Sequence, residues 1–284
     1  MGEEKKLKRH ADGGGAHATE TITSTSNARV KRTVELRDKR ERDRTGLMLI
    51  EGARELSRAI ASGVAIECLY VCPAVMTHHE EKELLASPPP ARAPIIEVSP
   101  RVFEKIAYRG GTGGLLAVAR QPSRSLSDLP PESKALFLVV DAVEKPGNLG
   151  AIVRSADGAG AAGVIVCDSR TDLYNPNAIR ASIGTIFTVA CAQTETGAAI
   201  RWLKETRTTI VAASPGGALP YTKIDYTGRC AIVVGAEDTG LTAPWRRAAD
   251  RRVAIPMKGA ADSLNVSATA AILLYEALRQ RESV

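Results

Sequence analysis

The hydrophobic residues of this chain fall into short runs that alternate with longer segments of mixed polarity, the pattern of an α/β protein. Strands are expected over residues 47–51, 66–71, 95–98 and 115–119, and again over residues 135–140, 164–167, 210–213, 231–234 and 253–256. Helices are expected over residues 28–46, 53–62, 102–107, 150–162 and 266–278. The run over residues 135–140 is apolar throughout, which predicts a parallel strand buried on both faces of its sheet.

Composition changes along the chain suggest two folded units. Residues 1–26 are polar and rich in Gly, Ser and Thr, so they are expected to form a disordered tail. Residues 27–120 hold the first set of strands and helices, and residues 135–284 hold the second. The Pro- and Ser-rich residues 121–134 between them are expected to be a linker.

The expected helix over residues 28–46 is densely charged and has only a sparse apolar stripe. Two interpretations stay open. It is either an ordinary solvated helix face or a surface that contacts phosphates through residues such as Arg37, Arg40 and Arg44. The net charge of +6 and the pI of about 9.1 agree with a polyanionic partner but do not identify one.

Some classes of protein are disfavoured by what the sequence lacks. No apolar run reaches the ~18 residues that a membrane span needs, and the first residues do not resemble a secretory signal. The five cysteines form no CxxC pair and lie mostly in apolar runs, which favours reduced, buried thiols in a cytoplasmic protein. All four histidines precede residue 80, so the second unit can hold neither a histidine-based triad nor a histidine-containing zinc site, and no metal is expected.

One motif match is misleading. Gly158, Gly160 and Gly163 fit the GxGxxG fingerprint of dinucleotide-binding enzymes. That fingerprint must follow a strand and open a helix, so that phosphate meets the helix N-terminus. Here the glycines end an expected helix and precede a strand, so they are interpreted as helix termination and close packing. A nicotinamide-dependent oxidoreductase therefore lacks its central feature.

Three other segments are expected to meet at the carboxyl edge of the second sheet, where open α/β sheets bind ligands. The first runs over residues 141–154 and offers Asn148 and Arg154 between glycines. The second, over residues 233–241, is a strand followed by a loop that carries Glu237. In the third, Ser263 and Asn265 precede the last helix, where they could cap that helix or bind an anionic group.

At these segments the chain closely resembles the SpoU (TrmH-type) branch of the SPOUT RNA methyltransferases. The first motif resembles N-x-G-x-I-x-R, the second G-x-E-x-x-G-L, and the third I-P-M followed by S-L-N-V-S. The matching residues are Asn148, Gly150, Ile152 and Arg154, then Gly235, Glu237, Gly240 and Leu241, then Ile255, Pro256, Met257 and residues 263–267. Arg180 begins a further matching segment. The first unit resembles the family's ribosomal-protein-like RNA-binding domain, so the resemblance covers nearly everything after residue 27.

The resemblance implies a trefoil-knotted methyltransferase domain, a homodimer, and S-adenosylmethionine as cofactor. It also implies the reaction, which is methylation of a ribose 2′-hydroxyl of RNA, with 23S ribosomal RNA as the expected substrate. Within the family the chain is similar to the antibiotic-resistance enzymes of antibiotic producers. The residues that the resemblance assigns to cofactor binding are Ala213, Ser214, Gly235, Ile255, Pro256, Met257, Leu264 and Val266.

The same resemblance assigns Arg154 to the ribose hydroxyl, with Asn148, Glu237, Ser263 and Asn265 positioning it, and Arg180 to the substrate. A guanidinium has a pKa above ~12, so we expect Arg154 to orient the ribose or phosphate rather than to remove a proton. Two alternatives are a ribose methyltransferase that acts on transfer RNA and a non-catalytic RNA-binding protein. Binding of S-adenosylmethionine and mapping of the methylated RNA would separate them.

Overall fold

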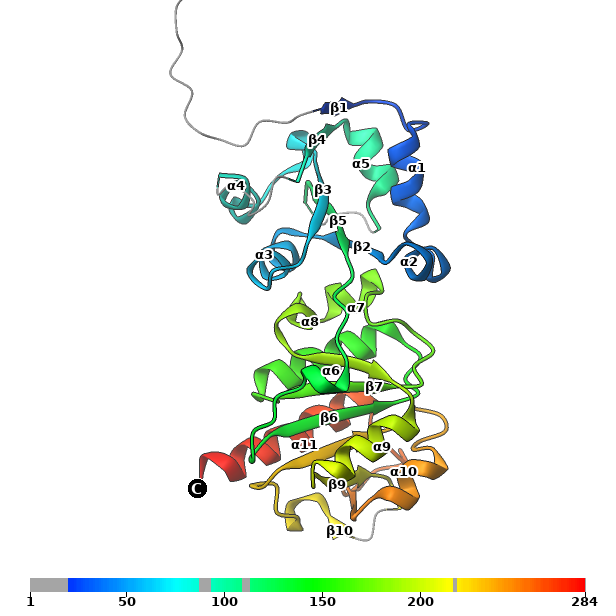
Figure 1. The fold of residues 1–284 in the computed structure, drawn as a ribbon, viewed down its shortest axis with the longest axis vertical. Helices are drawn as coiled ribbons and strands as arrows, with labels where there is room; N and C mark the ends of the chain where they lie inside the picture. The colour runs from blue at the N-terminus through cyan, green and yellow to red at the C-terminus, as the bar shows by residue number, and fades with distance from the viewer. Residues whose placement is uncertain (1–19, 87–92, 109–112, 217–218, 284) are drawn as a thin grey trace, which may run out of the picture.

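The structure is a computed structural model that describes residues 20–86, 93–108, 113–216 and 219–283. It is an α/β protein built on two sheets, which Figure 1 shows one above the other along the long axis of the molecule. The predicted α/β class is therefore confirmed. No helix in the described ranges is long and apolar enough to cross a membrane.

The N-terminal sheet has five strands in the order β1-β4-β3-β5-β2. These are β1 (Glu20–Ile22), β2 (Leu47–Glu51), β3 (Ile66–Val71), β4 (Ile95–Val98) and β5 (Leu115–Arg120). β5 runs antiparallel to both β2 and β3, and the other pairs are parallel. Neighbouring residues of β2 point to opposite faces, so Leu49 joins one hydrophobic cluster while Met48 and Ile50 join another.

Helices cover both faces of this sheet. α1 (Ala28–Glu35) packs against α5 (Pro100–Ile106) on the face that contains Leu49. α3 (Ala53–Ala61) lies on the other face beside α4 (His79–Ala86). α2 (Lys39–Thr45) leads into β2, and a 3₁₀ turn, η1 (Pro73–Val75), follows β3.

The C-terminal sheet has seven parallel strands in the order β10-β12-β9-β11-β6-β7-β8. These are β6 (Leu136–Asp141), β7 (Gly163–Cys167), β8 (Cys191–Thr194), β9 (Thr209–Ala213), β10 (Leu219–Pro220), β11 (Cys230–Val234) and β12 (Arg251–Ala254). Every residue of β6 is buried, as its uninterrupted apolar run predicts.

The helices of this half also form two layers. Leu136, Leu138 and Val140 of β6 face the layer of α6 (Pro146–Gly158) and α11 (Val266–Glu282), whereas Phe137 and Val139 face the layer of α9 (Thr196–Glu205) and α10 (Ala243–Ala248). The remaining helical segments are α7 (Pro176–Ala181), α8 (Thr185–Thr188) and the 3₁₀ turns η2 (Leu126–Asp128) and η3 (Tyr221–Lys223). Gly160 has φ +65° and follows α6, so the misleading glycine motif does end a helix.

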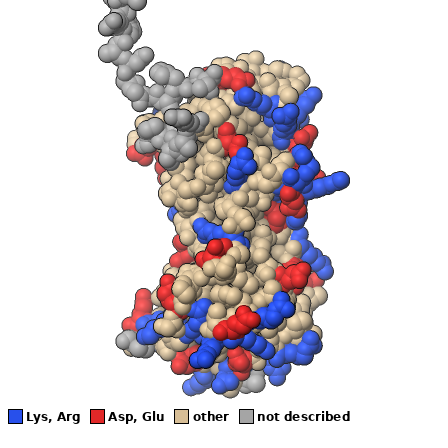
Figure 2. Space-filling view, viewed as in Figure 1, with Lys and Arg blue, Asp and Glu red and all other residues tan. Residues whose placement is uncertain are grey.

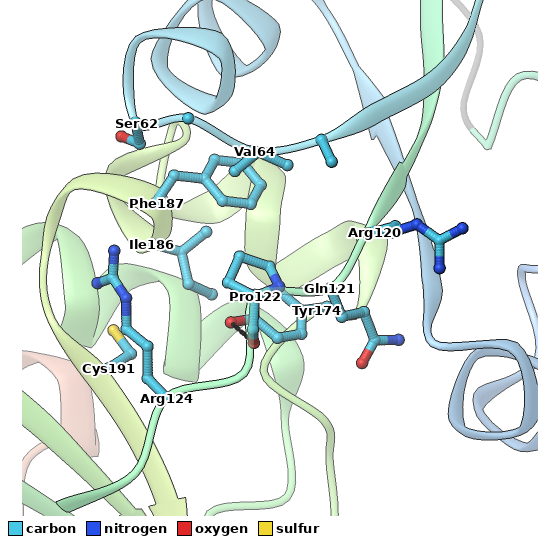
Figure 3. A pocket seen from close by; sticks show the side chains of 12 residues that line it. Ser62, Val64, Arg120, Gln121, Pro122, Arg124, Tyr174, Ile186, Phe187 and Cys191 are labelled. Atoms are coloured by element: carbon cyan, nitrogen blue, oxygen red, sulfur yellow. Dashed lines mark hydrogen bonds between the residues drawn. The ribbon is translucent and has the colours of Figure 1, made fainter. Parts of the chain in front are cut away.

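The two halves share one continuous hydrophobic cluster, which runs from Met48 and Leu56 through Ile186 and Phe187 to the α6 layer. α7 contacts β2 and α8 contacts α3. Figure 3 shows the junction, where Tyr174 donates a hydrogen bond to the carbonyl of Pro122 (2.8 Å) and Arg124 lies beside Cys191. Pro122 and Arg124 of the predicted linker thus pack against the C-terminal half and do not form a free connection between two separate domains.

Three sequence-based expectations need correction. Residues 20–22 of the predicted disordered tail form β1 and pair with β4, while residues 1–19 lie outside the described ranges. The single helix expected over residues 28–46 is two helices, because Asp38 turns away from helical geometry and caps α2 by accepting from Arg40 N–H (2.8 Å). α6 begins at Pro146 rather than at residue 150, because proline is favoured in a first helical turn.

Candidate functional site

The carboxylate of Glu237 joins the three motif segments. It lies in the loop after β11 and accepts hydrogen bonds from Asn148 Nδ2 (2.8 Å), Lys145 Nζ (2.8 Å) and Asn265 Nδ2. Asn148 stands in the first turn of α6, and Asn265 caps α11. The parallel strands β6 and β11 are neighbours, so the loops that follow them meet at one edge of the sheet.

Asn265 caps α11, which is one of the two roles that the sequence left open. Its Oδ1 accepts from the backbone N–H (2.9 Å) and the hydroxyl (2.6 Å) of Ser267, which is a helix cap. Its Nδ2 is therefore turned toward Glu237 and toward Asn148 Oδ1 (3.4 Å). The cap thus fixes which end of the amide faces the site.

Lys145 and Glu237 form an ion pair, and the side-chain amides of Asn148 and Asn265 donate hydrogen bonds to the same carboxylate. The hydrogen bond from Lys145 lowers the pKa of Glu237 below its usual value, and the same bond raises the pKa of Lys145. The side chain of Glu237 is 28% exposed and that of Lys145 is 73% exposed. The carboxylate is therefore ionised near neutral pH and accepts hydrogen bonds only.

A cavity of about 450 Å³ opens beside this network, between the ends of β9, β11 and β12 and the start of α11. Seven of the eight residues that the resemblance assigns to the cofactor line it. They are Ala213, Ser214, Gly235, Ile255, Met257, Leu264 and Val266. Pro256 is exposed and is not among the lining residues, whereas Glu237 and Ser263 are.

The loop that forms one wall of this cavity is folded back on itself. A Cβ added at Gly235 would lie 2.4 Å from the carbonyl carbon of Gly240, so only glycine permits this close approach. Gly240 itself has φ +65°. Asp141, at the end of β6, is buried and accepts from Thr242 N–H (2.8 Å), which ties the end of the loop to the sheet. The sequence showed Asp141 only as the end of a strand, and no local pattern indicated this tether.

Arg154 lies elsewhere. It is exposed and lines a second cavity of about 470 Å³ with Arg180, Asn177, Ala181 and Ile183. Pro146 and Gly147, in the same turn of α6 as Asn148, line this cavity too. The first turn of α6 therefore separates the Glu237 network from the Arg154 cavity, and the structure brings together Asn148, Glu237 and Asn265 but not Arg154.

The N-terminal half reaches this second cavity. Asn177 Nδ2 donates to the hydroxyl of Tyr108 (3.0 Å), and Arg58 donates to the carbonyl of Ile183. Sequence reasoning missed both Asn177 and Tyr108. Asn177 lies three residues before Arg180 and could have been found from that neighbourhood, but Tyr108 carries no local signal.

The three arginines predicted to contact phosphate differ in their surroundings. Arg37 is partly buried and donates to the carbonyls of Lys105 (2.9 Å) and Ala107. Arg44 pairs with Glu41, with its Nε 2.9 Å from Oε2. Arg40 is exposed, and no ion pair to it occurs within the described residues. The described residues also contain no cluster of three or more His, Cys, Asp or Glu that could hold a metal ion.

Comparison with known proteins places these features in a family. Residues 135–275 match the model of the SpoU rRNA Methylase family, and residues 27–117 match that of an MRM3-like substrate binding domain. The chain is 31% identical over 274 residues to the 23S rRNA (uridine(2479)-2′-O)-methyltransferase of Streptomyces viridochromogenes, covering 94% of each protein.

Solved structures of RNA methyltransferases are similar to this chain in both sequence and fold. A crystal structure of an RNA 2′-O ribose methyltransferase is 42% identical, with a TM-score of 0.82 over 92% of this chain and 99% of that one. The SpoU methyltransferase AviRb from Streptomyces viridochromogenes, in complex with AdoMet, is 30% identical, with a TM-score of 0.84 over 90% of this chain and 99% of that one. These similarities extend over both sheets.

Proposed function

This chain belongs to the SpoU rRNA methylase family and is an S-adenosylmethionine-dependent RNA 2′-O-ribose methyltransferase; we propose that the network around Glu237 and the Arg154 cavity form its reaction centre. Its relatives methylate 23S ribosomal RNA, and we propose the same substrate here. The observation that carries the proposal is the meeting of Asn148, Glu237 and Asn265 at the rim of the 450 Å³ cavity. The trefoil knot is implied by membership of the family.

The cavity fits the cofactor. Its floor is formed by the buried side chains of Val234, Val253 and Leu273, which suit an adenine ring, and its rim carries polar loops. Its volume is within the range of sites for ligands of this size. When bound there, S-adenosylmethionine supplies a methyl group on a cationic sulfur, which an oxygen nucleophile can take. Ala213, Gly235 and Leu264 would hold it largely through their backbone.

The protein's own residues provide positioning. Glu237 fixes the two asparagines on either side of it, so a substrate group at this edge meets a rigid set of polar atoms. Arg154 and Arg180 place two positive charges in the neighbouring cavity, where they would bind the phosphates beside the target ribose. A nearby cation also lowers the pKa of the ribose hydroxyl, which favours its reaction as a nucleophile.

The domain assignment is part of this proposal. We assign residues 27–120 to RNA substrate binding, residues 121–134 to the connection, and residues 135–284 to methyl transfer, in agreement with the ranges that the two family models match. We propose a homodimer, which the resemblance to the family implies. We also propose a cytoplasmic location and a role in antibiotic resistance, the latter from the resemblance to enzymes of antibiotic producers.

The test is substitution of Arg154. Arg154→Ala should lower methyl transfer to ribosomal RNA by about 10² or more, because orientation of the reacting group is lost. Affinity for S-adenosylmethionine, measured by calorimetry, should stay unchanged, because Arg154 does not line the 450 Å³ cavity.

Labelled methyl transfer to 23S ribosomal RNA and to transfer RNA, compared side by side, identifies the substrate. Methylation of transfer RNA alone would overturn the assignment of ribosomal RNA as substrate. If neither RNA were methylated, the assignment of methyltransferase activity would be wrong. Normal turnover of Arg154→Ala would remove that arginine from the reaction centre.

A further inference from the structure

Most basic residues of the segment over residues 28–46 are already engaged within the protein. The charged segment over residues 28–46 has eight basic residues: Arg29, Lys31, Arg32, Arg37, Lys39, Arg40, Arg42 and Arg44. Four of them, Arg29, Lys39, Arg42 and Arg44, form ion pairs within the protein, and Arg37 is held by two carbonyls. Most of the predicted phosphate-binding charge is therefore already neutralised or committed.

A second group of basic residues forms no ion pairs among the described residues, although Arg251 within it donates a hydrogen bond to the carbonyl of Asp250 (2.9 Å). Residues 196–209 and 243–254 contain seven basic residues and only two acidic ones, Glu205 and Asp250. The basic residues are Arg201, Lys204, Arg207, Arg246, Arg247, Arg251 and Arg252, all of them exposed. None forms an ion pair with any described residue. Asp250 already accepts from Ile210 N–H (2.8 Å) through its carboxylate.

Six of these residues lie on α9, α10 or β12, and Arg207 lies in the turn between α9 and β9. α9 packs against α10, and β12 pairs with β9, which follows α9. Figure 2 shows many Lys and Arg side chains, with Asp and Glu among them, over the lower end of the molecule, where Figure 1 places α9 and α10. We call this surface the α9–α10 patch. At one border Arg246 also lines the 450 Å³ cavity, so the patch is continuous with the cofactor site.

We propose that the α9–α10 patch binds the phosphate backbone of the RNA substrate and holds it against the methyltransferase domain. A row of exposed arginines without acidic partners is repulsive in itself and is relieved by a polyanion, which releases counterions when it binds. The proposal rests on the assigned RNA methyltransferase function and adds the surface on which the RNA lies. It requires no sequence readout by these arginines, because phosphate contacts position RNA without reading its bases.

The experiment is a triple substitution, Arg247→Gln, Arg251→Gln and Arg252→Gln, in the full chain. Arg246 is left intact because it borders the cofactor cavity. Binding to a 23S ribosomal RNA transcript is measured between about 50 and 200 mM salt. If each arginine contacts one phosphate, the slope of log affinity against log salt becomes shallower by about 2 to 3. The affinity for S-adenosylmethionine stays at the parent value.

The control removes two charges outside both residues 27–120 and the patch. Lys134→Gln and Lys223→Gln replace exposed side chains that form no ion pair among the described residues. This variant should keep the parent slope. An unchanged slope in the patch variant, or an equal change in the control, would overturn the patch. If the parent protein methylates no RNA, the proposed function fails instead, so the two failures can be told apart.

Discussion

At the scale of single residues, Glu237 accepts hydrogen bonds from three side chains that lie far apart in the sequence. Protonation would turn one carboxyl oxygen into a hydroxyl donor and remove the charge that attracts Lys145, so the ionised form favours the network. The hydrogen bond from Lys145 is the first cause of the lowered pKa of Glu237. A group with a lowered pKa stabilises its surroundings above its ordinary pKa and loses that effect as the pH falls through the lowered value.

Replacement of Lys145 should therefore change the pH dependence of the reaction. Lys145→Met removes the main cause of the lowered pKa of Glu237, so the acid limb of the kcat profile should move to higher pH. The shift should be modest, because both side chains are partly exposed and solvent screens their interaction. Lys145→Arg should restore the parent profile. An acid limb that stays in place in Lys145→Met would show that Glu237 does not control it.

At the scale of elements, α6 positions the site through its packing on α7. A Cβ at Gly150 would lie 2.3 Å from the carbonyl oxygen of Ala178 and 2.7 Å from the Cβ of Ala181. The two helices can approach so closely only because this position is glycine. The motif glycine is thus explained by helix packing, and it also sets the distance between Asn148 on α6 and Arg180 on α7.

Substitution of two glycines of α6 distinguishes the effect of packing against α7 from the effect of helix propensity on stability. Gly150→Ala should destabilise the protein by about 1–3 kcal/mol or more, because the added methyl group overlaps backbone atoms that cannot move away. Gly147→Ala has nothing within 4 Å of its added Cβ and should be neutral or stabilise by up to about 1 kcal/mol. Chemical denaturation measures both. Equal effects of the two substitutions would mean that the contact with α7 does not limit this position.

The elements also show how far the sequence could lead. The strands β2, β3, β4, β6 and β11 were predictable, because short apolar runs bounded by polar segments usually form buried strands. α9 and α10 were not predicted, because the buried stripe of α9 includes the small residues Thr196 and Ala199 beside Leu203, and α10 has only six residues. The meeting of Asn148 with Glu237 and Asn265 was expected from strand ends and family motifs, whereas the separate cavity of Arg154 depends on which face of α6 carries each side chain.

At the scale of the whole molecule, the two halves are joined by a buried ion pair that the sequence concealed. Arg42 is surrounded in the sequence by charged, exposed residues, yet its side chain is 1% exposed. Its guanidinium donates to both carboxylate oxygens of Asp172 in the C-terminal half (3.2 and 2.6 Å) and to the carbonyls of Leu36 and Arg37. This bidentate pair helps to fix the orientation of the N-terminal half relative to the C-terminal half.

Breaking the pair should loosen that orientation. Arg42→Met leaves Asp172 buried without its partner and should lower the free energy of unfolding by about 3–5 kcal/mol, whereas Arg42→Met with Asp172→Leu should lose much less. Lys39→Met, in the exposed pair with Asp43, is the control and should cost less than about 1 kcal/mol. Where the double variant remains folded, KM for RNA should rise while affinity for S-adenosylmethionine is unchanged, because we propose that the RNA contacts both halves, whereas the cofactor cavity lies in the C-terminal half alone. An unchanged KM for RNA would mean that the apolar contacts between β2, α3, α7 and α8 are enough to hold the two halves in register.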